Sequence, residues 1–301
     1  MDIYVPNKRL WIPDNTIADS LASPPAISRM IAYNKHIRCL TPHRVMMGAA
    51  GAGGVADFHT NALHLNGTDE YLANTTNTAL GIIDDWSLFV WCATPTVTGN
   101  VRITTFKSTS DSNNRFYIAR FGSEFLIQMF DSSGTEVKQW ITTNSPFSAD
   151  ITALMHIGVT WTGNTTLTFY INGSAVGAGD ITETVDSTGT MTDTSRAVYV
   201  GTNPAIAALW TGTMHSTDLF NTELPAAAVT AMYDSGNGYK LDLRNTSGNY
   251  TQTANLMHYW NHGENSSNLG EDLGNAGTLI DIDANAANIT AADIVDFATG
   301  V

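Results

Sequence analysis

The sequence predicts an all-β protein, a two-sheet antiparallel sandwich preceded by an extended N-terminal arm. From residue 61 onward, short runs of β-branched and aromatic residues are separated by Gly, Asn, Asp and Ser turns at near-regular intervals. This spacing is typical of antiparallel sandwiches and barrels. Helical features gather in only one stretch of that region, 222–236. The chain has 301 residues, 43% of them hydrophobic, which is enough to bury a large core.

Residues 1–57 are predicted to form the arm and a glycine-rich hinge, and residues 58–301 the sandwich. The arm contains prolines at 6, 13, 24, 25 and 42 and ends in the flexible run GAAGAGGVADF. Residues 1–56 carry six basic and three acidic side chains, a formal charge of +3. Residues 57–301 carry eight basic and 25 acidic side chains, a formal −17, and the two parts give the net −14 of the chain.

The composition excludes several partner classes. An acidic, lysine-poor body repels nucleic acid and anionic membranes, so we expect neither as a main ligand. No apolar run of about 18 residues suggests a membrane span, and the first residues lack a signal-peptide pattern, so secretion through a leader is not expected. The two cysteines, Cys39 and Cys92, lie in segments of different composition, and we expect buried thiols instead of a disulfide.

Alternation predicts a hairpin over 155–171. Strand side chains point to opposite faces in turn, which places Met155, Ile157, Val159 and Trp161 on one apolar face. The turn TGNT leads to a second strand at 166–171, and Asn172-Gly173 favours a type I′ turn into a third strand. In 86–92 both faces are largely apolar, which predicts a central strand covered on both sides.

The remaining elements follow from similar patterns. Residues 222–236 predict a short helix with Thr222 as N-cap, Pro225 in the first turn and Gly236 past the end. Further strands are predicted in the runs 101–108, 115–122, 124–131, 135–142, 197–202 and 209–221.

Five segments in this order resemble a known family. The segments 63–73, 86–95, 155–177, 197–202 and 210–234 together resemble the laminin-G-like, concanavalin A-like jelly roll over about residues 60–240. They are most similar to the subgroup found in large bacterial surface proteins and tailed-phage virion proteins. The stretch 256–280 resembles the return segment with which phage members close the sheet. The resemblance implies that 86–93 lies in the middle of one sheet and that an Asn-Gly hairpin at 61–73 edges the other.

The chain departs from the family at two motifs. The usual Gly-x-Ile-Asp-Glu-Val-Arg reads Gly212-Thr-Met-His215-Ser-Thr-Asp218 here, without acids at the Asp and Glu positions. Glycoside hydrolases of this fold carry Glu-x-Asp-x-x-Glu, which places two carboxyl groups in the groove, and the triplet is absent from this sequence. No nucleophile elbow, phosphate loop or paired-cysteine motif occurs either. We therefore predict no catalytic residues and no enzymatic activity.

Candidate binding residues fall into two groups. Sugar rings could stack on Trp140, Trp210, Tyr117 and Tyr199 across a concave sheet, the alternative being that Trp86, Trp91 and Trp161 belong to the core and the other tryptophans cover sheet edges. We expect no cofactor, and calcium is the candidate metal for two acidic stretches. Its candidate ligands are Asp69 and Glu70 in an acidic turn, and Asp281, Asp283 and Asn285 in a stretch like the opening of a calcium loop, the alternative being solvated loops.

A third metal candidate is the pair His258 and His262, with Glu264 close by. Their spacing suits a metal pair on a helix, but in the strand favoured by the surroundings they lie about 13 Å apart.

The resemblance favours a non-enzymatic phage virion protein of the capsid-decoration, head-fibre or tail-fibre type, assembled in the host bacterial cytoplasm. We expect its arm to bind other virion proteins of the capsid or tail, its copies to form a homo-oligomer, and host-surface glycans to be further ligands. The anchoring residues expected in the arm are Leu10, Trp11, Ile12, Arg29, Ile31, Tyr33, Lys35 and Arg38. The alternative is an extracellular carbohydrate-binding module, secreted or on a cell surface.

Overall fold

The computed structural model consists of two compact units, 1–55 and 56–301. It describes residues 3–5, 10–12, 59–82, 85–108, 115–131, 133–143, 146–147, 149–150, 153–163, 166–186, 195–282 and 288–296. In the first unit, β1 (Ile3–Val5) and β2 (Leu10–Ile12) pair with each other as an antiparallel ribbon. The second unit contains the sandwich.

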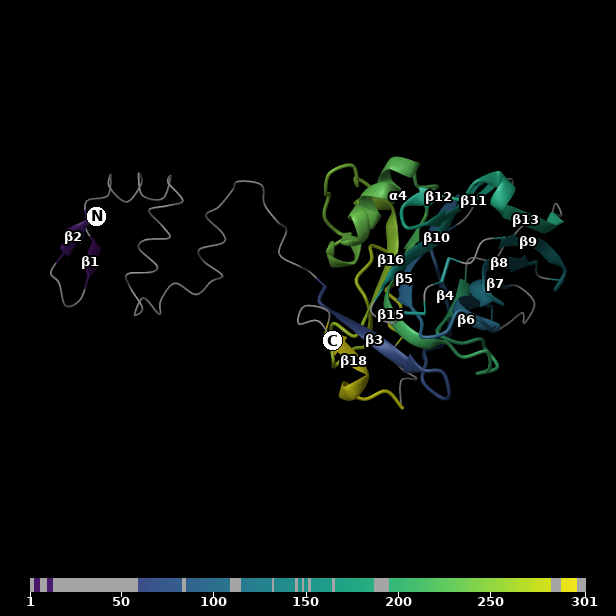
Figure 1. Cartoon of the computed structure of the whole chain (residues 1–301), viewed down its shortest axis with the longest axis horizontal. Helices are drawn as coiled ribbons and strands as arrows, with labels where there is room; N and C mark the ends of the chain where they lie inside the picture. The colour runs from purple at the N-terminus through teal and green to yellow at the C-terminus, as the bar shows by residue number, and fades with distance from the viewer. Residues whose placement is uncertain are drawn as a thin grey trace. The chain divides into compact units, whose positions relative to one another are not determined.

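The second unit is all-β with two antiparallel sheets, which confirms the predicted fold class (Figure 1). The order in the nine-stranded sheet is β12 (Ser174–Ala175), β11 (Thr166–Ile171), β10 (Met155–Thr162), β5 (Trp86–Ala93), β15 (Thr211–Phe220), β16 (Leu256–His262) and β17 (Gly270–Asp272), with β3 (Asn61–Asn66) paired to β15 and β18 (Ile294–Asp296) paired to β3. The strands β16 and β17 show that the 256–280 segment does return to a sheet, beside β15.

The seven-stranded sheet faces the nine-stranded one. Its order is β13 (Ile181–Asp186), β9 (Glu136–Thr142), β8 (Glu124–Phe130), β7 (Arg115–Phe121), β6 (Val101–Lys107), β14 (Ser195–Val200) and β4 (Leu72–Ala79). Short 3-10 helices lie at Ala178–Asp180, Asp234–Gly236, Gly238–Lys240, Thr253–Asn255 and Ala291–Asp293. None of the described helices is long and apolar enough to cross a membrane.

The two most detailed strand predictions are confirmed. Strands β10 and β11 pair with Val159 opposite Phe169, and the following Asn172 and Gly173 have φ angles of 50° and 75°, as a turn into β12 requires. Strand β5 is buried along its whole length and lies between β10 and β15. Leu88 stands opposite Val159 of one neighbour and Leu219 of the other, so β5 is the central strand predicted from its two apolar faces.

The predicted Asn-Gly hairpin at 61–73 is wrong. Strand β3 pairs with β15, whereas β4 lies at the edge of the other sheet beside β14, so the connection between them crosses from sheet to sheet. Side chains hold a wider turn than a two-residue hairpin allows. The Asn66 Oδ1 accepts from the Thr68 N–H at 2.7 Å, and Glu70 Oε2 accepts from the Asn66 N–H at 2.7 Å. Of the prediction that this segment lies at the edge of the second sheet, only the position of β4 agrees with the structure.

The helix α4 spans Ala226–Tyr233 and begins later than predicted. Its N-cap is Pro225, and Thr222 does not cap it. The reason is a contact with β5: the Ser87 hydroxyl donates to the Thr222 carbonyl at 2.8 Å and accepts from the Leu224 N–H at 2.9 Å. These two hydrogen bonds hold the residues before Pro225 in a non-helical conformation. At the other end, Asp234 adopts a left-handed conformation with φ 42°.

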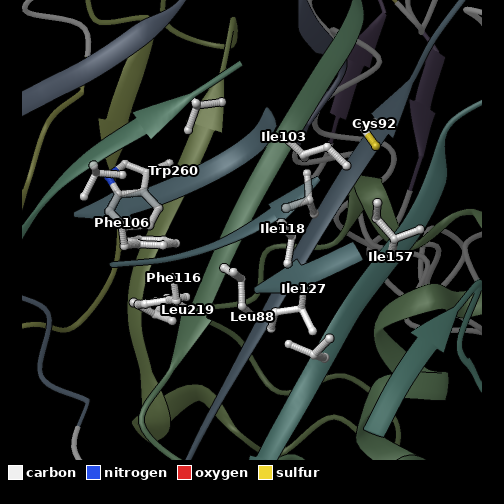
Figure 2. Packing of buried hydrophobic residues seen from close by; sticks show 14 of the residues in the cluster. Leu88, Cys92, Ile103, Phe106, Phe116, Ile118, Ile127, Ile157, Leu219 and Trp260 are labelled. Carbon is white, nitrogen blue, oxygen red and sulfur yellow. The ribbon is translucent and has the colours of Figure 1, made fainter. Parts of the chain in front are cut away.

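The main core lies between the two sheets (Figure 2). It is filled by fully buried side chains from both layers, among them Leu88, Cys92, Ile103, Phe106, Phe116, Ile118, Ile127, Ile157, Leu219 and Trp260. Burial raises the pKa of the Cys92 thiol to about 12, so it is an inert core group, and Cys39 lies outside the described residues. A second, smaller core lies beneath α4, where Val229 and Met232 pack with Phe89 and Phe220 on the opposite face of the nine-stranded sheet.

Candidate ligand-binding face

The outer face of the seven-stranded sheet is built by the same alternation that fills the core. In β7, Phe116 and Ile118 point into the core, and the side chains between and beside them therefore point outward. Four strands contribute to one transverse row on that outer face. The row consists of Thr105, Tyr117, Gln128 and Gln139, each opposite the next in register.

Two adjoining hollows lie along this row and share Arg102 and Tyr117. The first, here called the basic hollow, has a volume of about 240 Å³. It is lined by Arg102, Thr105, Lys107, Arg115, Tyr117, Asn203, Pro204 and Ala205. The second, here called the amide hollow, has a volume of about 290 Å³. It is lined by Asn100, Arg102, Tyr117, Phe121, Leu126, Gln128, Gln139, Ile141 and Ala208.

Aromatic rings hold the two guanidinium groups in place. The Arg102 Cζ lies 3.8 Å from the centroid of the Tyr117 ring, and the Arg115 Cζ lies 3.8 Å from the centroid of the Phe130 ring. The two rings are 6.4 Å apart. Such cation–π contacts fix the planes of both guanidinium groups. Because Arg102 covers Tyr117, the Tyr117 ring is only 5% exposed, and the guanidinium is the group offered to a ligand.

The electrostatics of the basic hollow are unusual for so acidic a body. Burial lowers the pKa of Arg102 and raises the pKa of Tyr117, since both charged forms lose contact with water there. Within the described ranges, no carboxylate lies within ion-pair distance of Arg102 or Lys107. Arg102 and Lys107 therefore carry positive charge that the described residues leave without a carboxylate partner.

The wall of the basic hollow is a tightly held loop, 201–210. The Asn203 side chain accepts from the N–H groups of Ala205 at 3.1 Å and Ala207 at 2.9 Å, and the Arg102 N–H donates to the Ala208 carbonyl at 2.9 Å. Two non-glycine residues are left-handed, Ile206 at φ 53° and Ala208 at φ 57°. Such conformations are strained and persist only where the surroundings impose them. The wall is therefore preformed.

The amide hollow offers hydrogen-bonding groups beside an apolar rim. Gln139 Nε2 donates to Glu136 Oε1 at 2.7 Å, and Gln128 Nε2 donates to the same oxygen. Glu136 thus orients both amides, and the Gln128 carbonyl oxygen remains as an acceptor. Phe121, 43% exposed, stands on the rim. Polar amides next to an exposed ring suit a ligand with both hydroxyl groups and an apolar face.

The structure does not bring the four predicted stacking residues together. Tyr117 lines both hollows, and Tyr199, 7% exposed, packs with Ala73 and Ala197 at the β14 and β4 end of the sheet. Trp140 and Trp210 belong to the main core, and Trp210 is fully buried. Inward rings have no face left for a sugar, because the opposite sheet covers them. The residues missed by sequence reasoning, chiefly Arg102, Gln128 and Gln139, occupy outward positions of strands that the alternation did identify.

The candidate metal ligands are likewise dispersed. Glu70 is nearly buried and accepts the Asn66 N–H, while Asp69 accepts from the Asn66 amide at 2.9 Å. Asp281 accepts from the Asp272 N–H at 3.0 Å and from the Asn268 amide at 3.1 Å. Asp283 and Asn285 lie outside the described residues. Among the side chains that are described, no group of three or more His, Cys, Asp or Glu is arranged to hold a metal ion.

The two histidines spaced four apart lie on strand β16, as the surroundings favoured. His258 Nδ1 is 2.6 Å from Asp272 Oδ2, and His262 Nε2 is 3.0 Å from Thr217 Oγ1. Both imidazoles are buried, so each is a hydrogen-bonded core side chain.

Comparison with known families agrees with the sandwich fold. Residues 66–230 match the model of a laminin G family described as the concanavalin A-like lectin/glucanases superfamily. The chain belongs to this superfamily. The concanavalin A-like part of the expected resemblance is therefore confirmed, and the virion part stays a prediction. No curated protein matches the sequence.

Solved structures similar to this superfamily member share little of its sequence. A heptameric SAP-like pentraxin from Limulus polyphemus has a TM-score of 0.44 and 13% identity, over 60% of this chain and 84% of its own. The Ruminococcus gnavus IT-sialidase CBM40 bound to alpha2,3 sialyllactose has a TM-score of 0.42 and 7% identity, over 60% of this chain and 100% of its own. A structure from Bacteroides ovatus whose name describes a carbohydrate-binding protein has a TM-score of 0.43 and 9% identity, over 67% of this chain and 51% of its own.

Proposed function

We propose that the sandwich is a non-catalytic glycan-binding module and that the outer face of the seven-stranded sheet takes the sugar. The observation that carries this proposal is the pair of adjoining hollows that share Arg102 and Tyr117. Their position on a rigid sheet, with a preformed loop as wall, is typical of sites that hold a ligand without rearrangement. Membership in a lectin/glucanase superfamily supports the same class of ligand.

The lining matches the chemistry of a sugar. The side-chain amides of Gln128 and Gln139 supply donors, and the Gln128 carbonyl oxygen supplies an acceptor, for sugar hydroxyl groups. The exposed ring of Phe121 supplies an apolar surface for a pyranose face. The binding energy of such a site is spread over several modest contacts, so we expect each one to be measurable separately.

The same linings argue against hydrolysis. Glycoside cleavage needs two carboxyl groups held about 5–10 Å apart across the bond. Neither hollow, as far as the described residues line it, contains an Asp or a Glu. A bound glycan would therefore meet no acid and base pair, which supports binding without turnover.

Replacing Phe121 by Ala is expected to weaken glycan binding about tenfold, the equivalent of about 1.4 kcal/mol, since it removes the exposed ring on the rim. The measurement is titration calorimetry with the best ligand of a broad glycan array. Leu279→Ala is the matched control, because Leu279 is 51% exposed and lines neither hollow. We expect no release of reducing ends from any glycan. An array without a single ligand, or equal weakening by both variants, would contradict the proposal.

We further propose that the module is displayed on a virion, with the N-terminal arm as its anchor and copies of the chain as a homo-oligomer. The support is the separate compact unit at 1–55 and the +3 charge of residues 1–56 against −17 for the body. Exposed ion pairs contribute only about 0–1 kcal/mol each, so apolar anchors such as Trp11 should dominate attachment. Of the arm residues named from the sequence, Leu10, Trp11 and Ile12 lie in β2, whereas Arg29, Ile31, Tyr33, Lys35 and Arg38 lie outside the described residues.

Deleting residues 1–56 tests the anchor. We expect a folded body with nearly unchanged melting temperature, because the sandwich begins after the deleted segment. Purified particles made with the truncated chain should lack it, as measured by its copy number per particle. Normal incorporation, or unfolding of the truncated chain, would show that the arm is not a detachable anchor. An extracellular module is the alternative if no particle contains the full-length protein.

A further inference from the structure

We propose that the basic hollow is a subsite for a carboxylate, so that the glycan bound on this face is an acidic one, with a uronic or sialic type of sugar. The inference rests on the proposed glycan-binding function and names the class of ligand. It concerns the part of the face formed by Arg102, Lys107 and Arg115, together with the loop wall at Pro204 and Ala205.

The charge distribution is the first argument. Residues 57–301 contain 25 acidic and only eight basic side chains, yet three of those eight line one hollow. Most of the other basic side chains have polar partners within the body. Lys138 forms an ion pair with Asp186, and Arg244 forms one with Asp242. The Arg120 guanidinium donates to the Thr94 hydroxyl and the Thr96 carbonyl. Arg102 and Lys107, in contrast, have no carboxylate partner among the described residues. A bound carboxylate would supply this missing counter-charge.

The geometry of the arginines is the second argument. A guanidinium offers a planar fork of N–H donors that matches the two oxygens of a carboxylate. The ring of Tyr117 fixes the plane of Arg102, and the ring of Phe130 fixes the plane of Arg115. Because these side chains are already held in place, less conformational entropy is lost when an anion binds. This preorganisation distinguishes the hollow from a surface on which flexible basic side chains merely extend into water.

The partial burial of Arg102 is the third argument. Its desolvation, seen as a lowered pKa, means that a charge partner gains more there than at a fully exposed arginine. The amide hollow begins at the same Arg102 and Tyr117, so a sugar whose carboxylate meets Arg102 can extend its hydroxyl groups toward Gln128. Together the two hollows would orient an acidic sugar with its carboxylate at the loop wall.

Matched ligand pairs test the inference with the full-length protein. The probes are trigalacturonic acid and its carboxyl-reduced form, sialyllactose and lactose, and a sulfated galactan oligosaccharide, each titrated by calorimetry at low and high salt. We expect at least one acidic member to bind at least tenfold more tightly than its neutral partner. The preference should shrink as salt rises, because the salt screens the pairing of charges.

Arg102→Gln should remove this preference, with at least a tenfold loss for the acidic glycan and a clearly smaller loss for its neutral partner. Arg244→Gln is the control, because Arg244 pairs with Asp242 and lines neither hollow. If Arg102→Gln does not fold, Lys107→Gln replaces it, since Lys107 lines only the basic hollow.

The outcomes separate the two proposals. Equal binding of acidic and neutral partners would overturn the carboxylate subsite and leave the glycan-binding function standing. Binding of the sulfated probe alone would also overturn it, because the ligand would then be a sulfate ester. If no glycan binds at all, both proposals fail. A preference that survives Arg102→Gln and Lys107→Gln would place the acid elsewhere on the molecule.

Discussion

Acidification from pH 7 to pH 5 is expected to lower the free energy of unfolding of the sandwich by about 5 kcal/mol. Burial lowers the pKa of His59 to about 2 and the pKa values of His156, His215 and His262 to about 3. In the unfolded chain each imidazole has a pKa near 6.5. Below that pH the unfolded state binds protons that the folded state does not bind, so the free energy of unfolding falls as the pH falls. The loss approaches about 1.4 kcal/mol per pH unit for each histidine.

The environment of these imidazoles explains why they stay neutral. His156 lies beside the rings of Phe89 and Trp91, at 5.0 and 4.8 Å between centroids, and neither of its nitrogens has a hydrogen-bond partner in the described structure. The His215 ring is 5.5 Å from His59 and 5.3 Å from Tyr239. Burial among these rings removes the water that would solvate an added positive charge, and a charge on His59 and one on His215 would repel each other.

One buried acid acts in the opposite direction. Burial raises the pKa of Asp218 to about 8, so the folded state keeps this proton while the unfolded state loses it above pH 4. Its contribution to stability is therefore lost as the pH rises toward 8 and regained on acidification. Between pH 7 and pH 5 the four histidines together lower the free energy of unfolding by about 8 kcal/mol and Asp218 raises it by about 3 kcal/mol, which leaves a net loss of about 5 kcal/mol. The free energy of unfolding of a typical domain is only about 5–15 kcal/mol.

Urea unfolding from pH 8 to pH 5, followed by tryptophan fluorescence, measures this slope. The control variant is His156→Phe, which removes one titrating group from an aromatic stack and replaces it with a ring of similar shape. We expect its slope below pH 6.5 to be shallower by about 1.4 kcal/mol per pH unit. A stability that stays constant from pH 7 to pH 5 would show that the buried histidines can be protonated in the folded state.

Asp272→Ala is expected to lower the free energy of unfolding by about 3–5 kcal/mol, since it removes a buried charge on which several groups depend. Asp272 is 2% exposed. Its Oδ1 accepts from the N–H groups of Tyr259 and Gly274, both at 3.0 Å. Its Oδ2 accepts from His258 Nδ1 at 2.6 Å and from the Ile280 N–H at 2.8 Å. Without the carboxylate, these donors stay buried and unpaired.

Chemical denaturation at pH 7 gives the size of this effect. Glu223→Ala serves as the control, because Glu223 is exposed and a substitution there should change stability by no more than about 0.5 kcal/mol. The loss in Asp272→Ala should also free the 270–282 segment, which would appear as faster amide exchange at Ile280. Equal stabilities of the two variants would mean that the hydrogen bonds of Asp272 do not hold the return segment in place.

The sequence by itself determined the elements whose cause is local. The alternation in 155–161 and 166–171, with an Asn-Gly turn after them, specifies a hairpin and its register. Two apolar faces in 86–92 specify a strand covered on both sides. The edge strands β4 and β13, LANTTNTA and ITETVD, carry no comparable signal, because a strand that borders solvent does not need an apolar face.

Tertiary structure alone decided what depends on neighbours distant in sequence. Which partner β3 chooses, and where α4 begins, follow from contacts with β15 and with Ser87 that no local pattern encodes. The candidate site is of the same kind. Alternation tells on which side of a strand Arg102, Tyr117 or Gln128 points, but only the register across β6, β7 and β8, and the loop folded against β6, place them around one hollow. The same packing turns Trp140 and Trp210 inward, because the sheet that covers them comes from the other half of the sandwich.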